Sequence, residues 1–358
     1  MSPLIRAVID TRALRANLET IRTRARGARV MAVIKANAYG HGLVQTALAL
    51  PQADAFAVAR LEEGIALREA GVSQSIVLLE GVFESEQLIE AALHRLQIVV
   101  HNEFQVALLE SFSGSYPFIV WLKIDTGMNR LGFRCEEFPP VLERIRNLTR
   151  PVREIRVLTH LARADERENP ATASQLSRFR EVTRGLFLSN SIGNSAGIFG
   201  WPDACGDWVR PGLALYGLSP FANESAASLG LRPAMTLETS VITVRDVPPG
   251  ESVGYGGAWS ASRRSRIAIV AGGYGDGILR TLPSGTPVLI EGRRAPLVGK
   301  VSMDMIAVDV TDLPAVQVGT RCTLWGSELP VDEIAARAGT ISYELLCGVR
   351  QRVPHEFI

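Results

Sequence analysis

Short apolar runs alternate with segments of helical periodicity from about residue 10 to residue 220. The first helical pattern contains Leu14, Leu18 and Ile21, spaced four and three apart, and Asp10 before it is a typical N-cap residue. Eight strand-length apolar runs follow, at residues 30–34, 55–59, 76–79, 97–100, 118–124, 155–158, 186–189 and 212–216. Helical patterns lie between them, at residues 61–70, 84–92, 103–111, 137–148 and 171–184.

Nearly continuous apolar runs are typical of parallel strands that are buried on both faces. Eight such strands alternating with helices favour a closed barrel over an open doubly wound sheet. The pattern therefore predicts an α/β fold with a (β/α)8 TIM-type barrel over residues 10–222.

The pattern changes after Ser219-Pro220, where residues 223–230 are small and polar and resemble a linker. Beyond them, β-type runs punctuated by Pro and Gly occur at residues 239–244, 266–271, 287–290 and 305–310, and only residues 331–338 form a clear helical pattern. The apolar residues 4–9 precede the first barrel helix and have no barrel partner. We therefore expect a mostly-β C-terminal domain built from residues 1–9 and 223–358.

Composition narrows the kind of partner. Hydrophobic residues make up 47% of the chain, charged residues 21%, and the formal net charge is +1. This balance does not suggest nucleic acid or a membrane surface and favours a small-molecule substrate. The apolar runs are too short to span a membrane, and the first residues lack the apolar region of a signal peptide.

The spacing of the cysteines indicates whether the chain binds a metal and in which kind of compartment it works. Cys135, Cys205, Cys322 and Cys347 are widely spaced, with no CxxC pair and no histidine nearby to complete a metal site. This spacing argues against bound metal and against a disulfide framework, and it suits a reducing compartment. We therefore expect a cytoplasmic protein without a metal.

Catalytic residues of TIM-type barrels stand at the C-terminal ends of the strands. Lys35 directly follows the first apolar run and precedes a turn that contains Gly40 and Gly42. Desolvation there favours the neutral, nucleophilic amine, although most lysines extend to the surface. The position indicates that Lys35 is the central chemical group.

Other polar residues follow later strands. The fifth ends in Lys123 and Asp125, which share a face and are expected to be an ion pair with Arg130 nearby. His160 ends the sixth and would be a hydrogen-bond donor behind the site. Asn194-Ser195 follows the seventh at a small-residue turn of the kind that suits a phosphate.

Taken in order, these short motifs resemble the alanine racemase family, whose members are fold-type III pyridoxal-phosphate enzymes. The resemblance runs through almost the whole chain and is specific as an ordered set. It rests on residues 32–42, 123–132, His160, Asn194-Ser195, 210–216, 253–256, 273–277 and 302–304.

The resemblance implies a pyridoxal 5'-phosphate cofactor, a homodimer with active sites shared between subunits, and racemisation of alanine by two bases. Lys35 would bind the cofactor as an aldimine and act as one base, and Tyr255 of the partner subunit would be the other. Arg210 would lie against the pyridine nitrogen. Arg130 and His160, if charged, would stabilise the Tyr255 phenolate.

The remaining implied roles concern the ends of the site. The residues placed near the cofactor and its phosphate are Tyr39, His160, Asn194, Ser195, Gly212 and Tyr216, with Tyr343 a weaker candidate. Arg130, Met303, Asp304 and Tyr274 would contact the substrate or line its entrance. Lys123 resembles a lysine that is often carbamylated in this family, which would make it an anion facing Arg130.

The sequence departs from the family at Gln351, where some members have a tyrosine packed against the catalytic tyrosine. A glutamine there could admit a hydroxymethyl side chain, so serine is a candidate secondary substrate. Two alternatives stay open: a fold-type III amino-acid decarboxylase, and a non-enzymatic cofactor carrier. The decarboxylases carry a C-terminal cysteine and a Gly-rich phosphate loop, and neither is clear in this sequence. A carrier protein would need no second base such as Tyr255.

Overall fold

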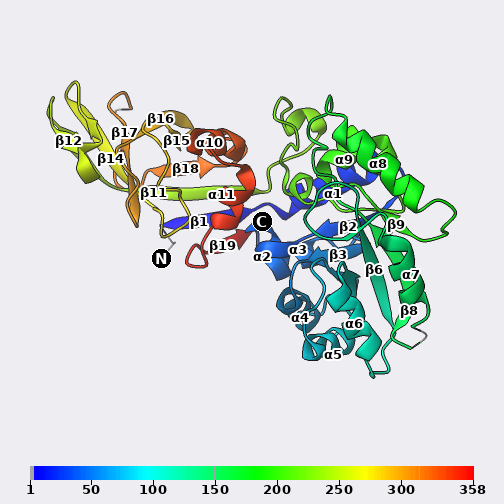
Figure 1. The fold of residues 1–358 in the computed structure, drawn as a ribbon. Helices are drawn as coiled ribbons and strands as arrows, with labels where there is room; N and C mark the ends of the chain where they lie inside the picture. The colour runs from blue at the N-terminus through cyan, green and yellow to red at the C-terminus, as the bar shows by residue number, and fades with distance from the viewer. Residues whose placement is uncertain (1–3, 149, 314) are drawn as a thin grey trace. The chain divides into compact units, whose positions relative to one another are not determined.

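A computed structural model describes residues 4–148, 150–313 and 315–358. The chain forms two compact units: Leu14–Ala38 with Leu43–Leu231, and Tyr39–Gly42 with Arg232–Ile358 and the described residues before Leu14. Helices surround the strands of the first unit, whereas strands dominate the second (Figure 1). None of the described helices is long and apolar enough to cross a membrane.

The first unit is an eight-stranded parallel barrel, which confirms the predicted fold class. Its strands pair in a ring that closes between β5 and β6. A further short strand, β7 (Phe133–Arg134), pairs with β6 outside the ring. The barrel strands are β2 (Arg29–Val33), β3 (Ala55–Val58), β4 (Ser75–Leu78), β5 (Gln97–Val100), β6 (Phe118–Asp125), β8 (Val152–Leu158), β9 (Asn190–Ser191) and β10 (Trp208–Val209).

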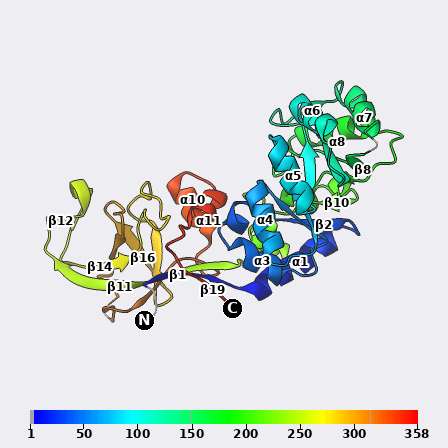
Figure 2. The ribbon, with the colours of Figure 1, turned by 90° about the horizontal axis from the view of Figure 1, so that it is seen from below.

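Helices α1 to α9 belong to this part of the chain, and Figure 2 shows α5 to α8 around the barrel strands. Asp10 caps α1 as expected, because its Oδ1 accepts hydrogen bonds from the backbone N–H groups of Arg12 and Ala13. The helices are α1 (Thr11–Arg24), α2 (Lys35–Tyr39), α3 (Leu43–Ala49), α4 (Leu61–Glu69), α5 (Ser85–Leu93), α6 (Glu103–Ser111), α7 (Phe138–Arg146), α8 (Ala171–Val182) and α9 (Ser195–Gly200).

Two predicted barrel strands are wrong. Residues 186–189 are irregular, with Phe187 fully exposed, and the seventh strand is β9 instead. Residues 212–216 contain a 3₁₀ helix, Leu213–Tyr216, and the eighth strand is β10, which lies before Pro211. The run 212–216 is buried throughout, and a short buried apolar run fits a strand and a helical turn equally well, so periodicity could not separate them. The run 186–189 is apolar in sequence but not buried, so its composition was misleading.

The second unit is mostly β, as predicted. Its strands β11, β14, β15, β16, β17 and β18 form a closed ring because β14 pairs with both β11 and β17. They span β11 (Met235–Val247), β14 (Ser265–Ala271), β15 (Pro287–Ile290), β16 (Arg293–Val298), β17 (Met305–Asp309) and β18 (Arg321–Trp325). The small hairpin of β12 (Ser252–Val253) and β13 (Trp259–Ser260) is separate from the ring.

The opening strand β1 (Ile5–Ile9) joins this second unit, as expected. It pairs antiparallel with β11 and parallel with β19 (His355–Phe357). Helix α10 (Val331–Ala338) matches the one predicted helix of the unit. A second helix, α11 (Ser342–Gly348), was missed because seven residues are too few for a helical period to stand out.

Candidate active site

Lys35 follows β2 and begins a strained turn. The φ angles of Ala36, Asn37, Ala38 and Tyr39 are 53°, 54°, 54° and 52°, so α2 is a left-handed turn. A left-handed turn costs roughly 1–2 kcal/mol per non-glycine residue. Backbone strain of this kind persists where neighbours enforce it, and it clusters at functional sites. The geometry therefore singles out the residues after Lys35, whose own side chain is partly exposed.

Within its own unit, the segment Tyr39–Gly42 packs against α11. A Cβ atom on Gly40 would lie 2.0 Å from the carbonyl oxygen of Leu346, so only glycine fits there. The rings of Tyr39 and Tyr343 are 5.6 Å apart between centroids. Burial, with a smaller contribution from Tyr343, raises the pKa of Tyr39. Its hydroxyl therefore stays protonated, and its predicted contact with the phosphate remains a prediction.

Lys123 is buried on β6, on the barrel interior. Burial is the main cause that lowers its pKa to about 7, and the positive charges of Arg210 and Arg130 add to the effect. The expected ion pair with Asp125 is wrong. The Asp125 carboxylate instead accepts hydrogen bonds from the backbone N–H groups of the loop 127–129. A large fraction of Lys123 is thus neutral at pH 7.

Arg210 lies buried directly after β10. Its Nη1 donates to Ser191 Oγ at 2.6 Å, and its Nη2 donates to the carbonyl oxygens of Thr159 and Ile192. Burial lowers the pKa of Arg210 to about 10, which still leaves it charged at neutral pH. Among the described residues its Nε–H has no acceptor. That donor can reach a ligand nitrogen.

His160 lies 3.4 Å from Arg210, measured from its Nδ1 to Nη2. Burial and then the positive charge of Arg210 lower the pKa of His160 well below its usual value, with Lys123, Arg130 and Lys35 adding to the effect. The imidazole is therefore neutral, and the expectation that a charged His160 could stabilise a phenolate is wrong. The same interactions place these four basic side chains within interaction range of His160.

The turn after β9 forms a polar cradle. Asn194 caps α9 through Oδ1, which accepts the Gly197 N–H at 2.9 Å. Ser195 Oγ accepts the N–H groups of Gly212 and Ala214, both at 3.1 Å. Because Ser195 accepts twice, its own proton is left to donate to an anion.

Tyr216 fits the cradle less well. Its hydroxyl donates to the carbonyl oxygen of Val33 at 2.9 Å, so that proton is already used. Its predicted contact with a phosphate stays a prediction.

In the second unit Tyr255 lies between Gly254 and Gly256, whose φ angles of +76° and +69° favour glycine. The side chain of Tyr255 is 62% exposed. The guanidinium of Arg280 lies 5.7 Å from the Tyr255 ring and 5.9 Å from the Tyr274 ring, so it brings the two predicted tyrosines together. No motif pointed to Arg280.

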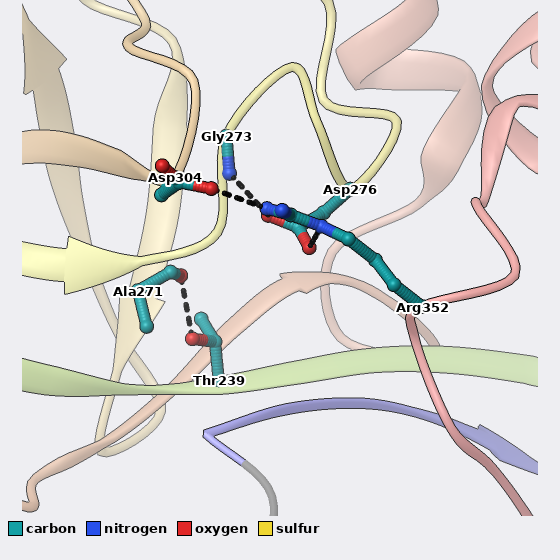
Figure 3. A network of polar contacts seen from close by, with 6 residues as sticks. All are labelled: Thr239, Ala271, Gly273, Asp276, Asp304 and Arg352. Atoms are coloured by element: carbon teal, nitrogen blue, oxygen red, sulfur yellow. Dashed lines mark hydrogen bonds and ion pairs between the residues drawn. The ribbon is translucent and has the colours of Figure 1, made fainter.

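Arg352 joins the two loops that carry Tyr274 and Met303 (Figure 3). It donates to both carboxylate oxygens of Asp276 and, at 2.7 Å, to Asp304 Oδ1. Asp276 also accepts the backbone N–H of Gly273 at 2.8 Å. Sequence reasoning missed Arg352, because it lies 76 positions from Asp276.

The structure thus gathers Lys123, His160 and Arg210 at one end of the barrel, within interaction range of Lys35 and Arg130. It gathers the second set in the β-rich unit. These members are Tyr255, Tyr274, Met303 and Asp304, linked through Arg280 and Arg352. The fold and the site define a two-domain barrel protein with a lysine-centred, basic site and a polar cradle after β9.

Comparison with known proteins identifies the family. Residues 9–220 match the alanine racemase N-terminal domain and residues 234–357 match the C-terminal domain. An alanine racemase of Shewanella amazonensis is 49% identical, with 99% of each chain covered. This chain therefore belongs to the alanine racemase family.

Solved structures agree. The biosynthetic alanine racemase of Pseudomonas aeruginosa is 46% identical, covers 100% of both chains and superposes with a TM-score of 0.94. A Bartonella henselae alanine racemase with covalently bound pyridoxal phosphate is 31% identical, also over 100% of both chains, with a TM-score of 0.87.

Proposed function

We propose that this chain interconverts L-alanine and D-alanine with pyridoxal 5'-phosphate as cofactor. The observation that carries the proposal is the cluster around Arg210, which occurs in a chain 49% identical to an alanine racemase over 99% of its length. The observation against the carrier alternative is the separate set of polar residues around Tyr255 and Arg280, since simple binding needs no such set.

The residues present fit the cofactor. The free Nε–H of Arg210 suits the pyridine nitrogen, and the unused proton of Ser195 suits a phosphate oxygen, as do the N–H groups at the start of α9. Lys35 carries the amine for covalent attachment. When bound, pyridoxal phosphate supplies an electron-withdrawing ring that acidifies the α-hydrogen of the amino acid.

Racemisation needs a proton taken from one face and a proton returned to the other. We assign one face to the Lys35 amine and the other to the phenol of the partner subunit's Tyr255. A homodimer would supply that phenol. Tyr255 and Met303 are 62% and 53% exposed in the single chain, and such exposed apolar side chains suit a surface that a second copy covers.

Arg210 would restrain the chemistry to racemisation. An arginine gives up its proton far less readily than other side chains, so it leaves the pyridine nitrogen unprotonated. A weaker electron sink loses fewer substrate molecules to transamination or decarboxylation. This favours the racemase over the decarboxylase alternative.

The test is an absorbance spectrum of the purified protein in the visible band of a lysine-bound cofactor, together with racemase assays. We expect the band and activity in the wild type, loss of both in Lys35→Ala, and loss of activity with retention of the band in Tyr255→Phe. A Lys35→Ala protein with the wild-type band would exclude Lys35 as the attachment point. Carbon dioxide release without racemisation would favour the decarboxylase.

A further inference from the structure

A second cavity opens at the other end of the barrel, where the strands begin. Its volume is about 450 Å³, within the range of roughly 300–1,000 Å³ that is usual for small-molecule sites. Ser75, Gln97 and Ile119, at or next to the starts of β4, β5 and β6, line it. The end of β6 instead holds Lys123, so this cavity lies away from the candidate active site.

The walls of the cavity are positively charged. Arg68, Arg95 and Arg153 line it, and no aspartate or glutamate does. None of the three arginines forms an ion pair with a described residue. Glu90 pairs at 3.6 Å with His94, which also lines the cavity, and Glu154, next to Arg153 in the chain, pairs with Arg156.

Arg68 shapes the cavity rather than closing it. Its guanidinium donates to the carbonyl oxygens of Val72, Gln74, His94 and Arg95, at 2.6 to 3.3 Å. These bonds fix the loops after α4 and α5 and use most of its donors, but they leave its charge uncompensated by a carboxylate. Arg95 and Arg153 are exposed and have donors to spare.

Gln97 is a buried polar residue of the cavity wall, and its side chain is held in one orientation. It is 6% exposed, and its Oε1 accepts the indole N–H of Trp121 at 2.8 Å. An indole N–H can only donate, so the orientation of the amide is fixed. The Nε2 group therefore points away from Trp121, and it has no acceptor among the described residues. A buried amide donor held in this way, in a cavity with unpaired guanidinium groups, is suited to an anion.

We propose that this cavity binds a small organic anion. Arg95, Arg153 and the Gln97 Nε2 group hold its carboxylate or phosphate, and its carbon skeleton packs against Val72, Leu93 and Ile119, which also line the cavity. The site is separate from the one proposed for the cofactor, so the proposal does not depend on the racemase activity.

The test is isothermal titration calorimetry on cofactor-saturated protein with two probes, succinate for a carboxylate and glycerol 3-phosphate for a phosphate ester. We expect at least one probe to bind with a dissociation constant below about 1 mM. Arg95→Gln/Arg153→Gln and Gln97→Glu should each weaken it at least about tenfold. Gln97→Glu keeps an acceptor for Trp121 but replaces the donor by a negative charge.

Arg184→Gln is the matched control, because it removes an exposed barrel arginine that does not line the cavity. It should bind the probe like the wild type, and thermal unfolding should show that all variants are folded. The proposal is overturned if neither probe binds the wild type at about 10 mM. It is equally overturned if the arginine double variant or Gln97→Glu binds as tightly as the wild type. The probe that binds identifies the class of anion.

Discussion

Arg352 donates two parallel hydrogen bonds to the buried carboxylate of Asp276, from Nε to Oδ1 at 2.7 Å and from Nη2 to Oδ2 at 2.9 Å. The same Nη2 reaches Asp304, and Asp276 in turn holds the N–H of Gly273. One guanidinium therefore fixes the two loops that carry Tyr274 and Met303. A bidentate arginine sets both distance and angle, which a lysine cannot do.

We predict that Arg352→Ala lowers the free energy of unfolding, because it leaves the buried Asp276 carboxylate short of partners. Arg352→Lys should retain part of that stability but raise the KM for alanine more than it lowers kcat, since the loops bearing Met303 and Asp304 lose their alignment. Chemical denaturation and steady-state kinetics measure the two effects. Arg350→Ala, an exposed neighbour, is the control and should change stability by less than about 0.5 kcal/mol. If Arg352→Ala and Arg350→Ala had the same free energy of unfolding, Arg352 would not stabilise these loops.

The lowered pKa of Lys123 gives a pH dependence with a defined sign. Its pKa is about 7 when folded and its ordinary value is 10.5, so the unfolded chain binds more protons between these values. The burial cost of Lys123 is fully present below pH 7 and is relieved as the pH rises toward 10.5. We therefore predict that wild-type stability, measured against Lys123→Met in bicarbonate-free buffer, increases from about pH 7 to about pH 10. If the stability difference between the two proteins stays constant over this pH range, the pKa of Lys123 is not lowered.

The neutral amine of Lys123 is also a nucleophile for carbon dioxide. The nitrogen would attack the carbon atom and form a C–N bond, one C=O π pair would move to oxygen, and the amine proton would pass to water. The product is an anion in range of Arg130 and Arg210. We predict a carbamate ¹³C resonance in protein equilibrated with ¹³C-bicarbonate, and none in Lys123→Met. A wild-type spectrum without that resonance would rule the modification out under these conditions.

Arg210→Glu should loosen reaction specificity. A carboxylic acid can protonate the pyridine nitrogen, so we predict at least about a tenfold increase in pyruvate formed per racemisation event. Arg210 is enclosed by carbonyl oxygens, so folding of the variant has to be checked by its melting temperature. Arg210→Gln supplies no acidic proton to the pyridine nitrogen and should not increase pyruvate. An unchanged ratio in a folded Arg210→Glu protein would refute the assigned role.

Gln351 provides a test of substrate range. If this residue enlarges the alanine pocket, the wild type should racemise serine measurably, and Gln351→Tyr should lower the ratio of serine to alanine kcat/KM by about fivefold or more, which corresponds to about 1 kcal/mol. Chiral chromatography of both products gives the ratio. A negligible serine rate in the wild type would end this hypothesis.

The sequence predicted some elements to the residue, among them β5, α6, β15 and α10. The two strands are compact apolar runs, and the two helices each carry a helical pattern of apolar residues. Prediction failed at β9 and β10, which are two residues long and have no period to detect.

The candidate site also contains residues that the sequence predicted and residues that it did not. Lys35, Lys123 and His160 were found because each lies at or near the end of a barrel strand, and Arg210 was found through the family resemblance. The left-handed turn after Lys35 could not be predicted, because Ala36-Asn37-Ala38 contains no glycine that would indicate positive φ angles. Arg280 and Arg352 act through partners distant in the sequence, and only the folded chain reveals them.

Strand β1 is placed between β11 and β19, and Arg6 on β1 contacts Glu238 on β11, 232 positions later. On the ribosome β1 is therefore made early and stays without its neighbours while the whole barrel is synthesised. At about 5–20 residues per second the delay amounts to roughly tens of seconds. During that time the barrel can fold behind an open apolar strand, which is a natural binding site for a chaperone until translation supplies the rest of the sheet.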